Sequence, residues 1–137
     1  MLKLILDTNT IISAFFWEGN EAELFRKIEQ GKVSFFISKE ILREIKDVIN
    51  RPKFKEILTK SKITPEQIIQ KIILVAHMII GKDLNINLCR DPKDNKFLEC
   101  GEHAKADYIV SGDKDLLVLK NYKNLKIIKT SEMLKLI

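Results

Sequence analysis

Residues 108–117 read YIVSGDKDLL, and this stretch indicates the fold class. The apolar run YIV has the β-branched and aromatic content of a buried strand, and Asp113 and Asp115 follow where that strand ends. Residues 3–7, KLILD, repeat the arrangement with a second apolar strand that ends on Asp7. Ligands of parallel α/β sheets lie outside the carboxyl ends of the strands, so these carboxylates are candidates for a functional site.

Segments with strand and helix patterns alternate along the chain. Strands are expected at residues 3–6, 33–37, 108–111 and 126–129, and helices at 21–30, 39–50, 53–60, 64–80 and from Asp91 to about Lys105, followed by a terminal helix that Thr130 or Ser131 caps. The helix over 64–80 begins with a capping box between Thr64 and Gln67 and is expected to end at Gly81. Strands separated by helices predict an α/β fold, a three-layer α/β/α arrangement around a mostly parallel central sheet.

Length and composition fit one globular domain, residues 1–137. No apolar run reaches the roughly 18 residues that span a membrane, and LKLIL near the start is too short for a secretory signal, so a cytoplasmic location without membrane contact is expected. The net charge of +5, from 24 Lys and Arg against 19 Asp and Glu, fits an anionic partner such as nucleic acid. The lysines are spread along the chain, however, and an ordinary solvated surface explains them as well.

Asp94 stands out because it shares a helix face with apolar residues. Asp94, Phe97, Leu98 and Gly101 follow the spacing i, i+3, i+4, i+7, which places the carboxylate on the face that packs against the sheet. Asp91 is the expected N-cap, with proline at the first helical position. The alternative for Asp94 is the acidic member of a capping box, which explains an acid here but not its place in the apolar stripe.

Glu44 lies beside the apolar stripe of the predicted helix 39–50. On a helical wheel it falls about 40° outside Val48, closer to the buried face than Glu40 or Asp47. A carboxylate at the edge of a core destabilises the fold unless it meets a cation or a polar site. The alternative is a side chain that extends to solvent.

Asp7, Glu44, Asp94 and Asp113 are therefore four acids from four separate elements, expected together at one edge of the sheet. Their mutual repulsion would raise their pKa values unless a cation offset it, and oxygen ligands select hard ions such as Mg²⁺ or Mn²⁺. Singly, Asp7 and Asp113 also suit caps or turns. Asn9 and Ser111 are expected to orient the acids through hydrogen bonds, although both are common turn residues.

Four motifs in this order resemble the PIN-domain nucleases: LILDTN (4–9), ISKEILREIKDVI (37–49), DPKDNKFLE (91–99) and YIVSGDKDLL (108–117). The resemblance covers essentially the whole chain and is strongest to the branch that contains the VapC-type toxins of toxin–antitoxin systems. The Thr-Gly-Asp of that family appears here as Ser111-Gly112-Asp113, which keeps the hydroxyl group. Residues 100–102, Cys-Gly-Glu, stand where the family more often has alanines.

The resemblance implies a PIN-like fold and Mg²⁺- or Mn²⁺-dependent hydrolysis of RNA phosphodiester bonds. The residues that match the four acids of the family, and are expected to be catalytic, are Asp7, Glu44, Asp94 and Asp113. Of these, Asp7, Asp94 and Asp113 are the expected metal ligands, and Asp115 is a candidate accessory acid. The resemblance also implies a homodimer and a cognate antitoxin protein that blocks the site.

Three lysines close in sequence to the acids, Lys93, Lys96 and Lys114, are candidates for contacts with the RNA backbone. Their alternative is a solubilising role, since exposed lysines are common on any protein surface.

Three other readings remain open. A metal-dependent phosphatase of the haloacid dehalogenase type needs a second aspartate two residues after the first, where this chain has Asn9. A receiver domain needs a phosphoacceptor aspartate at a central strand end, where the strand 33–37 is followed by Ser38. A non-catalytic RNA-binding module would not need four acids.

Overall fold

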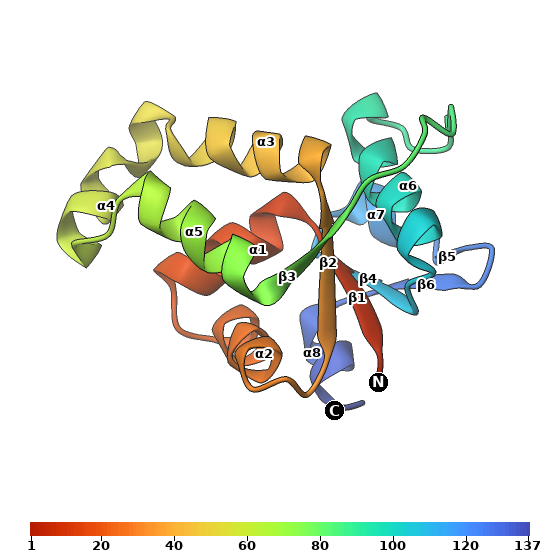
Figure 1. Cartoon of the computed structure of the whole chain (residues 1–137), viewed down its shortest axis with the longest axis horizontal. Coiled ribbons are helices and arrows are strands. Elements are labelled where there is room, and N and C mark those ends of the chain that lie inside the picture. The colour runs from red at the N-terminus through yellow and green to blue at the C-terminus, as the bar shows by residue number, and fades with distance from the viewer.

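A six-stranded sheet forms the middle of the molecule in the computed structural model, which describes residues 1–137 (Figure 1). The strands lie in the order β3-β2-β1-β4-β6-β5, and every neighbouring pair is parallel except β5 and β6. Their bounds are β1 Lys3–Leu6, β2 Ser34–Ser38, β3 Ala76–Ile79, β4 Tyr108–Val110, β5 Asn121–Tyr122 and β6 Leu125–Ile128. The expected mostly parallel α/β sheet is confirmed.

Helices surround this sheet, with α6 on one side and α1 and α2 on the other (Figure 1). The α-helices are α1 Thr8–Phe16, α2 Asn20–Glu29, α3 Lys39–Ile49, α4 Lys55–Ser61, α5 Pro65–Val75, α6 Asn95–Ala104, α7 Lys114–Leu117 and α8 Thr130–Leu134, and two short 3₁₀ helices are η1 Pro52–Phe54 and η2 Pro92–Asp94. Helix α6 contacts β1, β2, β3 and β4, while α2 contacts α1 and α8. No helix is both long enough and apolar enough to cross a bilayer.

Strand β1 is central because its residues are apolar on both faces. Leu4, Ile5 and Leu6 are at most 1% exposed. The register pairs Leu6 with Val110 of β4, and the backbone amide of Asp7 donates to the carbonyl of Val110 at 3.1 Å. The residues that follow β1 and β4 therefore reach the same edge of the sheet.

The helix expected over 64–80 is wrong in its second half. The capping box of Thr64 and Gln67 is present, but α5 ends at Val75 and the chain continues as β3 beside β2. Residues 72–80 are apolar almost throughout, so periodicity does not separate a buried helix from a strand there. Pairing with β2 decides the outcome, since it supplies backbone partners that the sequence pattern does not reveal.

Helix α1 was not expected, because its sequence TNTIISAFF is rich in β-branched and aromatic residues of modest helix propensity. Asp7 starts it as N-cap, accepting a hydrogen bond from the Thr10 amide at 2.8 Å. The first strand thus ends on a residue that also begins a helix.

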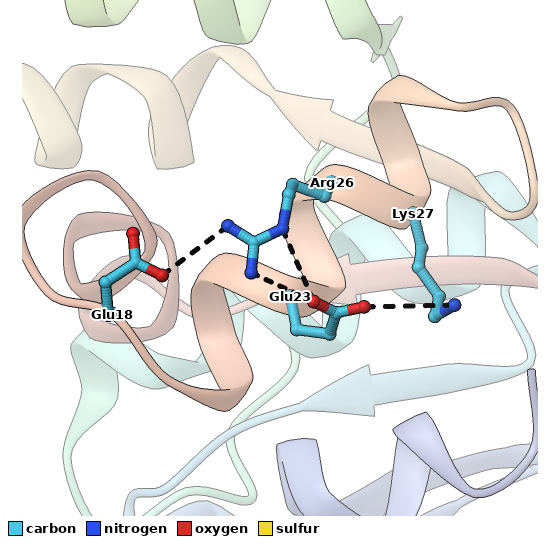
Figure 2. Close-up of polar contacts among 4 residues, drawn as sticks. All are labelled: Glu18, Glu23, Arg26 and Lys27. Carbon is cyan, nitrogen blue, oxygen red and sulfur yellow. Dashed lines mark hydrogen bonds and ion pairs between the residues drawn. The ribbon is translucent and has the colours of Figure 1, made fainter.

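Helix α2 carries a network of exposed ion pairs (Figure 2). Arg26 reaches Glu23 at 2.9 Å and Glu18, in the loop before the helix, at 3.7 Å, and Lys27 lies 4.0 Å from Glu23. The pairing with Arg26 lowers the pKa of Glu23. Exposed pairs of this kind contribute little to stability, so the network defines the surface of α2 rather than the fold.

Candidate active site

The carboxyl ends of β1 and β4 bring Asp7 and Asp113 to one edge of the sheet. Asp7 is only 4% exposed, and its second carboxylate oxygen, Oδ2, accepts a hydrogen bond from the buried hydroxyl of Ser111. The same Ser111 oxygen accepts a hydrogen bond from the backbone amide of Asp113 at 2.9 Å. Ser111 therefore links the two aspartates, and the hydroxyl kept at this position holds both strand ends in place.

Burial raises the pKa of Asp7 above its ordinary value. Hydrogen bonds from Ser111 and Thr10 lower the pKa and partly offset this effect, while the nearby charge of Asp113 raises it further. A cation next to Asp7 would offset both the desolvation and the repulsion.

Asp94 approaches the same place from the start of α6. Asp91 caps the preceding turn, accepting from the Lys93 amide at 3.0 Å, so the expected division between a capping Asp91 and an inward Asp94 is confirmed. The Oδ2 atom of Asp94 is buried and has no hydrogen-bond partner. Burial, followed by the charges of Asp113 and Asp91, raises the pKa of Asp94 to about 7.

Glu44 of α3 contacts Thr8, the residue after Asp7, and is partly buried, whereas Glu40 and Asp47 on the same helix are exposed, as expected from the helical wheel. Both of its oxygens are occupied. Oε1 accepts a hydrogen bond from the hydroxyl of Thr8, and Oε2 lies 2.6 Å from the Nζ atom of Lys96. The cation that Glu44 meets is thus part of the protein.

Sequence reasoning missed Thr8 and the pairing of Lys96. Of the three lysines considered for RNA contacts, Lys93 and Lys114 are exposed and form no ion pair, whereas the Lys96 side chain is 16% exposed and bound to Glu44. No pattern in the sequence signals either contact, because Thr8 and Lys96 lie far from Glu44 along the chain.

A polar cleft of about 720 Å³ opens over the strand ends. None of its lining residues is hydrophobic, and they include Asp7, Asn9, Asp113, Lys114 and Asp115. Asp115 also pairs with Arg90 at 3.3 Å, and its backbone amide donates to Asp113. Asn9 lines the cleft without a hydrogen bond to the acids. Such a lining suits a charged, hydrated ligand rather than an apolar one.

The donor set fits a divalent cation. No three His, Cys, Asp or Glu side chains stand in a ready metal cage, but Asp94 presents a buried oxygen without a partner beside Asp113. Asp7, Asp94 and Asp113 supply only oxygen atoms, which favour hard ions.

Residues 3–115 match the family model described as PIN domain. The chain belongs to the PIN-domain family. It is also similar to the uncharacterized protein MJ1680 of Methanocaldococcus jannaschii, with 35% identity over 131 residues that cover 92% of this chain and 81% of the relative. No solved structure matches the chain. PIN domains are generally metal-dependent nucleases, which agrees with a polar, acid-lined cleft in this member of the family.

Proposed function

We propose that this PIN domain is an endoribonuclease that hydrolyses RNA phosphodiester bonds with Mg²⁺ or Mn²⁺. The observation that carries the proposal is the buried, unpartnered oxygen of Asp94 beside Asp113, with the pKa of Asp94 raised to about 7. A carboxylate buried in this way without a donor destabilises the protein unless a cation binds it. A divalent ion is the partner that the donor set selects.

Each residue near the cleft has a role in this proposal. Asp7, Asp94 and Asp113 hold the ion, and Ser111 fixes Asp7 relative to Asp113 through its hydroxyl group. When bound, the ion offsets the charge of the scissile phosphate and lowers the pKa of a nearby water molecule. Lys114 at the cleft and the exposed Lys93, one residue before Asp94, are free to contact the RNA backbone, and Asp115 supplies an accessory carboxylate.

The test is cleavage of total RNA and of a single-stranded oligoribonucleotide in the presence of Mg²⁺, Mn²⁺ or EDTA. Cleavage is expected with either ion and none with EDTA, and Asp113→Asn should remove it. Undiminished cleavage in EDTA would rule out the metal mechanism. RNA binding without cleavage would instead favour the non-catalytic RNA-binding module, and hydrolysis of small phosphomonoesters alone would favour the phosphatase.

The proposal extends to a cytoplasmic toxin of a type II toxin–antitoxin pair, acting as a homodimer. Four apolar side chains support an interface: Ile73, Leu74, Met78 and Ile80 are between 44% and 88% exposed, at the end of α5 and in or directly after the edge strand β3. We call these four residues the edge patch. An antitoxin would place an Arg or Lys side chain towards the acids, where its charge substitutes for the metal. Relief of RNA cleavage by the co-expressed neighbouring gene product tests this part.

A further inference from the structure

Asp94 at the start of α6 and Glu44 of α3 differ in how their oxygen atoms are paired. Asp94 has a buried oxygen atom that no donor reaches. Glu44 has both oxygens paired inside the protein, one with the Thr8 hydroxyl and one with Lys96. Only the first of these carboxylates is left for an external cation.

The ion pair between Lys96 and Glu44 is the least exposed ion pair in the molecule. The two side chains are 16% and 26% exposed, and in each of the other seven ion pairs at least one side chain is more than a third exposed. Lys96 also donates to the backbone carbonyl of Lys93, and its Nζ atom lies 5.2 Å from the centre of the Phe97 ring. These contacts hold the ammonium group at the start of α6, two residues from Asp94.

We propose that Lys96 is a built-in counter-ion that withholds Glu44 from metal binding, so that the acidic cluster takes one divalent cation rather than two. This inference rests on the proposed metal-dependent function. A second divalent ion on Glu44 would have to displace the ammonium group or bind within a few ångströms of it, and like charges at that distance repel strongly in a partly buried site. Lys96 therefore supplies the positive charge that a second ion would bring.

The same arrangement separates two tasks among the acids. Asp7, Asp94 and Asp113 take the exchangeable ion, and Glu44 holds Lys96 in place while Thr8 fixes the carboxylate from the start of α1. Lys96 is thus a positioning residue that acts through Glu44, and not one of the freely exposed lysines that can follow an RNA strand.

The test is the number of Mn²⁺ ions bound per chain at neutral pH, measured by calorimetry and by the electron paramagnetic resonance signal of free Mn²⁺. Wild type and Lys96→Arg should bind one ion, and Lys96→Met should bind two. The double variant Lys96→Met/Glu44→Gln should return to one, because the freed carboxylate is gone. Lys71→Met removes the same charge and an inter-helix pair with Glu29 at 3.5 Å, and it should bind one ion as the wild type does.

One ion in Lys96→Met, or two in wild type, would overturn the inference and leave the proposed nuclease standing. If neither wild type nor Asp94→Asn binds Mn²⁺, the proposed function is overturned together with this inference. A measurement that does not depend on the folding of a variant is the anomalous signal of wild-type crystals soaked in Mn²⁺. One site is expected there, with Glu44 still on Lys96, and a second site on Glu44 would contradict the assignment.

Discussion

At the scale of single residues, burial and neighbouring carboxylates destabilise the charged form of Asp94. Its pKa is about 7 in the folded protein, against an ordinary value of 3.8. Between these two pH values the folded protein therefore keeps a proton on Asp94 that the unfolded chain has lost. The contribution of Asp94 to stability is therefore fully present below about pH 4 and is lost as the pH rises through about 7.

Asp94→Asn should remove this pH-dependent loss of stability. In the metal-free protein at pH 8 the free energy of unfolding should rise by about 1–2 kcal/mol, after allowance for solvent screening of a partly exposed group. RNA cleavage should disappear. Denaturant unfolding in EDTA at pH 5 and pH 8 measures the first effect, and the RNA assay measures the second.

Asp91→Asn is the control for Asp94→Asn, because asparagine caps a helix about as well as aspartate. Its activity and its pH dependence of stability should stay close to those of wild type. Equal loss of activity in the two variants would show that the division between cap and metal ligand is wrong.

Ser111 offers a second prediction for a single residue. Ser111→Ala leaves Asp7 Oδ2 without its donor in a site that is 4% exposed, so the free energy of unfolding at neutral pH should fall by about 1–3 kcal/mol. Metal affinity should fall by about 10- to 100-fold, since a hydrogen bond that orients a ligand is lost. Ser111→Thr keeps the hydroxyl group and should retain most of both.

Thermal unfolding and Mn²⁺ titration of the two Ser111 variants measure the predicted changes in stability and in metal affinity. If Ser111→Ala binds Mn²⁺ as tightly as wild type does, Ser111 has no role in positioning Asp7.

For the residues of the site, the sequence predicted positions but not long-range contacts. The inward position of Asp94 followed from helical spacing, and the partly buried position of Glu44 followed from the helical wheel. The partners of Glu44 did not follow, because Thr8 lies 36 residues from it in the chain and Lys96 lies 52. Contacts between distant elements depend on packing that periodicity does not encode.

At the scale of elements, the strands of the parallel part of the sheet were the most predictable. Strands β1, β2, β4 and β6 were expected from short segments rich in apolar, β-branched or aromatic residues, and the sheet contains all four. Helix α1 and strand β3 were missed for one shared reason: residues with modest local preference took the structure that their neighbours imposed. For α1 this is the cap at Asp7, and for β3 it is the edge of β2.

Helix α5 has a buried face and an exposed face, which substitutions two positions apart can distinguish. Ile72 is fully buried and Leu74 is 84% exposed. Ile72→Ala should lower the free energy of unfolding by about 2–4 kcal/mol through lost packing and a cavity. Leu74→Ala should change it by less than about 0.5 kcal/mol in the monomer. Denaturant titration of both variants at low protein concentration measures the difference. Equal losses of stability in the two variants would contradict this division of α5 into a buried and an exposed face.

At the scale of the whole molecule, the exposed edge patch beside β3 is a candidate interface. Strand β3 is the last strand on its side of the sheet, so its outer backbone groups have no strand partner, and the edge patch surrounds them with apolar side chains. Exposed sheet edges with apolar side chains are where another chain adds on. A second copy is the partner that the proposed homodimer calls for, and an interface on this edge lies apart from the cleft-lining residues.

Sedimentation at micromolar concentration should therefore give a dimer for the wild type. Leu74→Glu/Ile80→Glu should give a monomer, because two charges on the edge patch would be desolvated at the interface without partners. Leu136→Glu introduces one such charge on a side chain that is 51% exposed outside the edge patch, and it should remain dimeric. The monomeric variant should keep its metal binding, since the acids all come from one chain. A monomeric wild type would refute the dimer, and a dimeric double variant would move the interface to another surface.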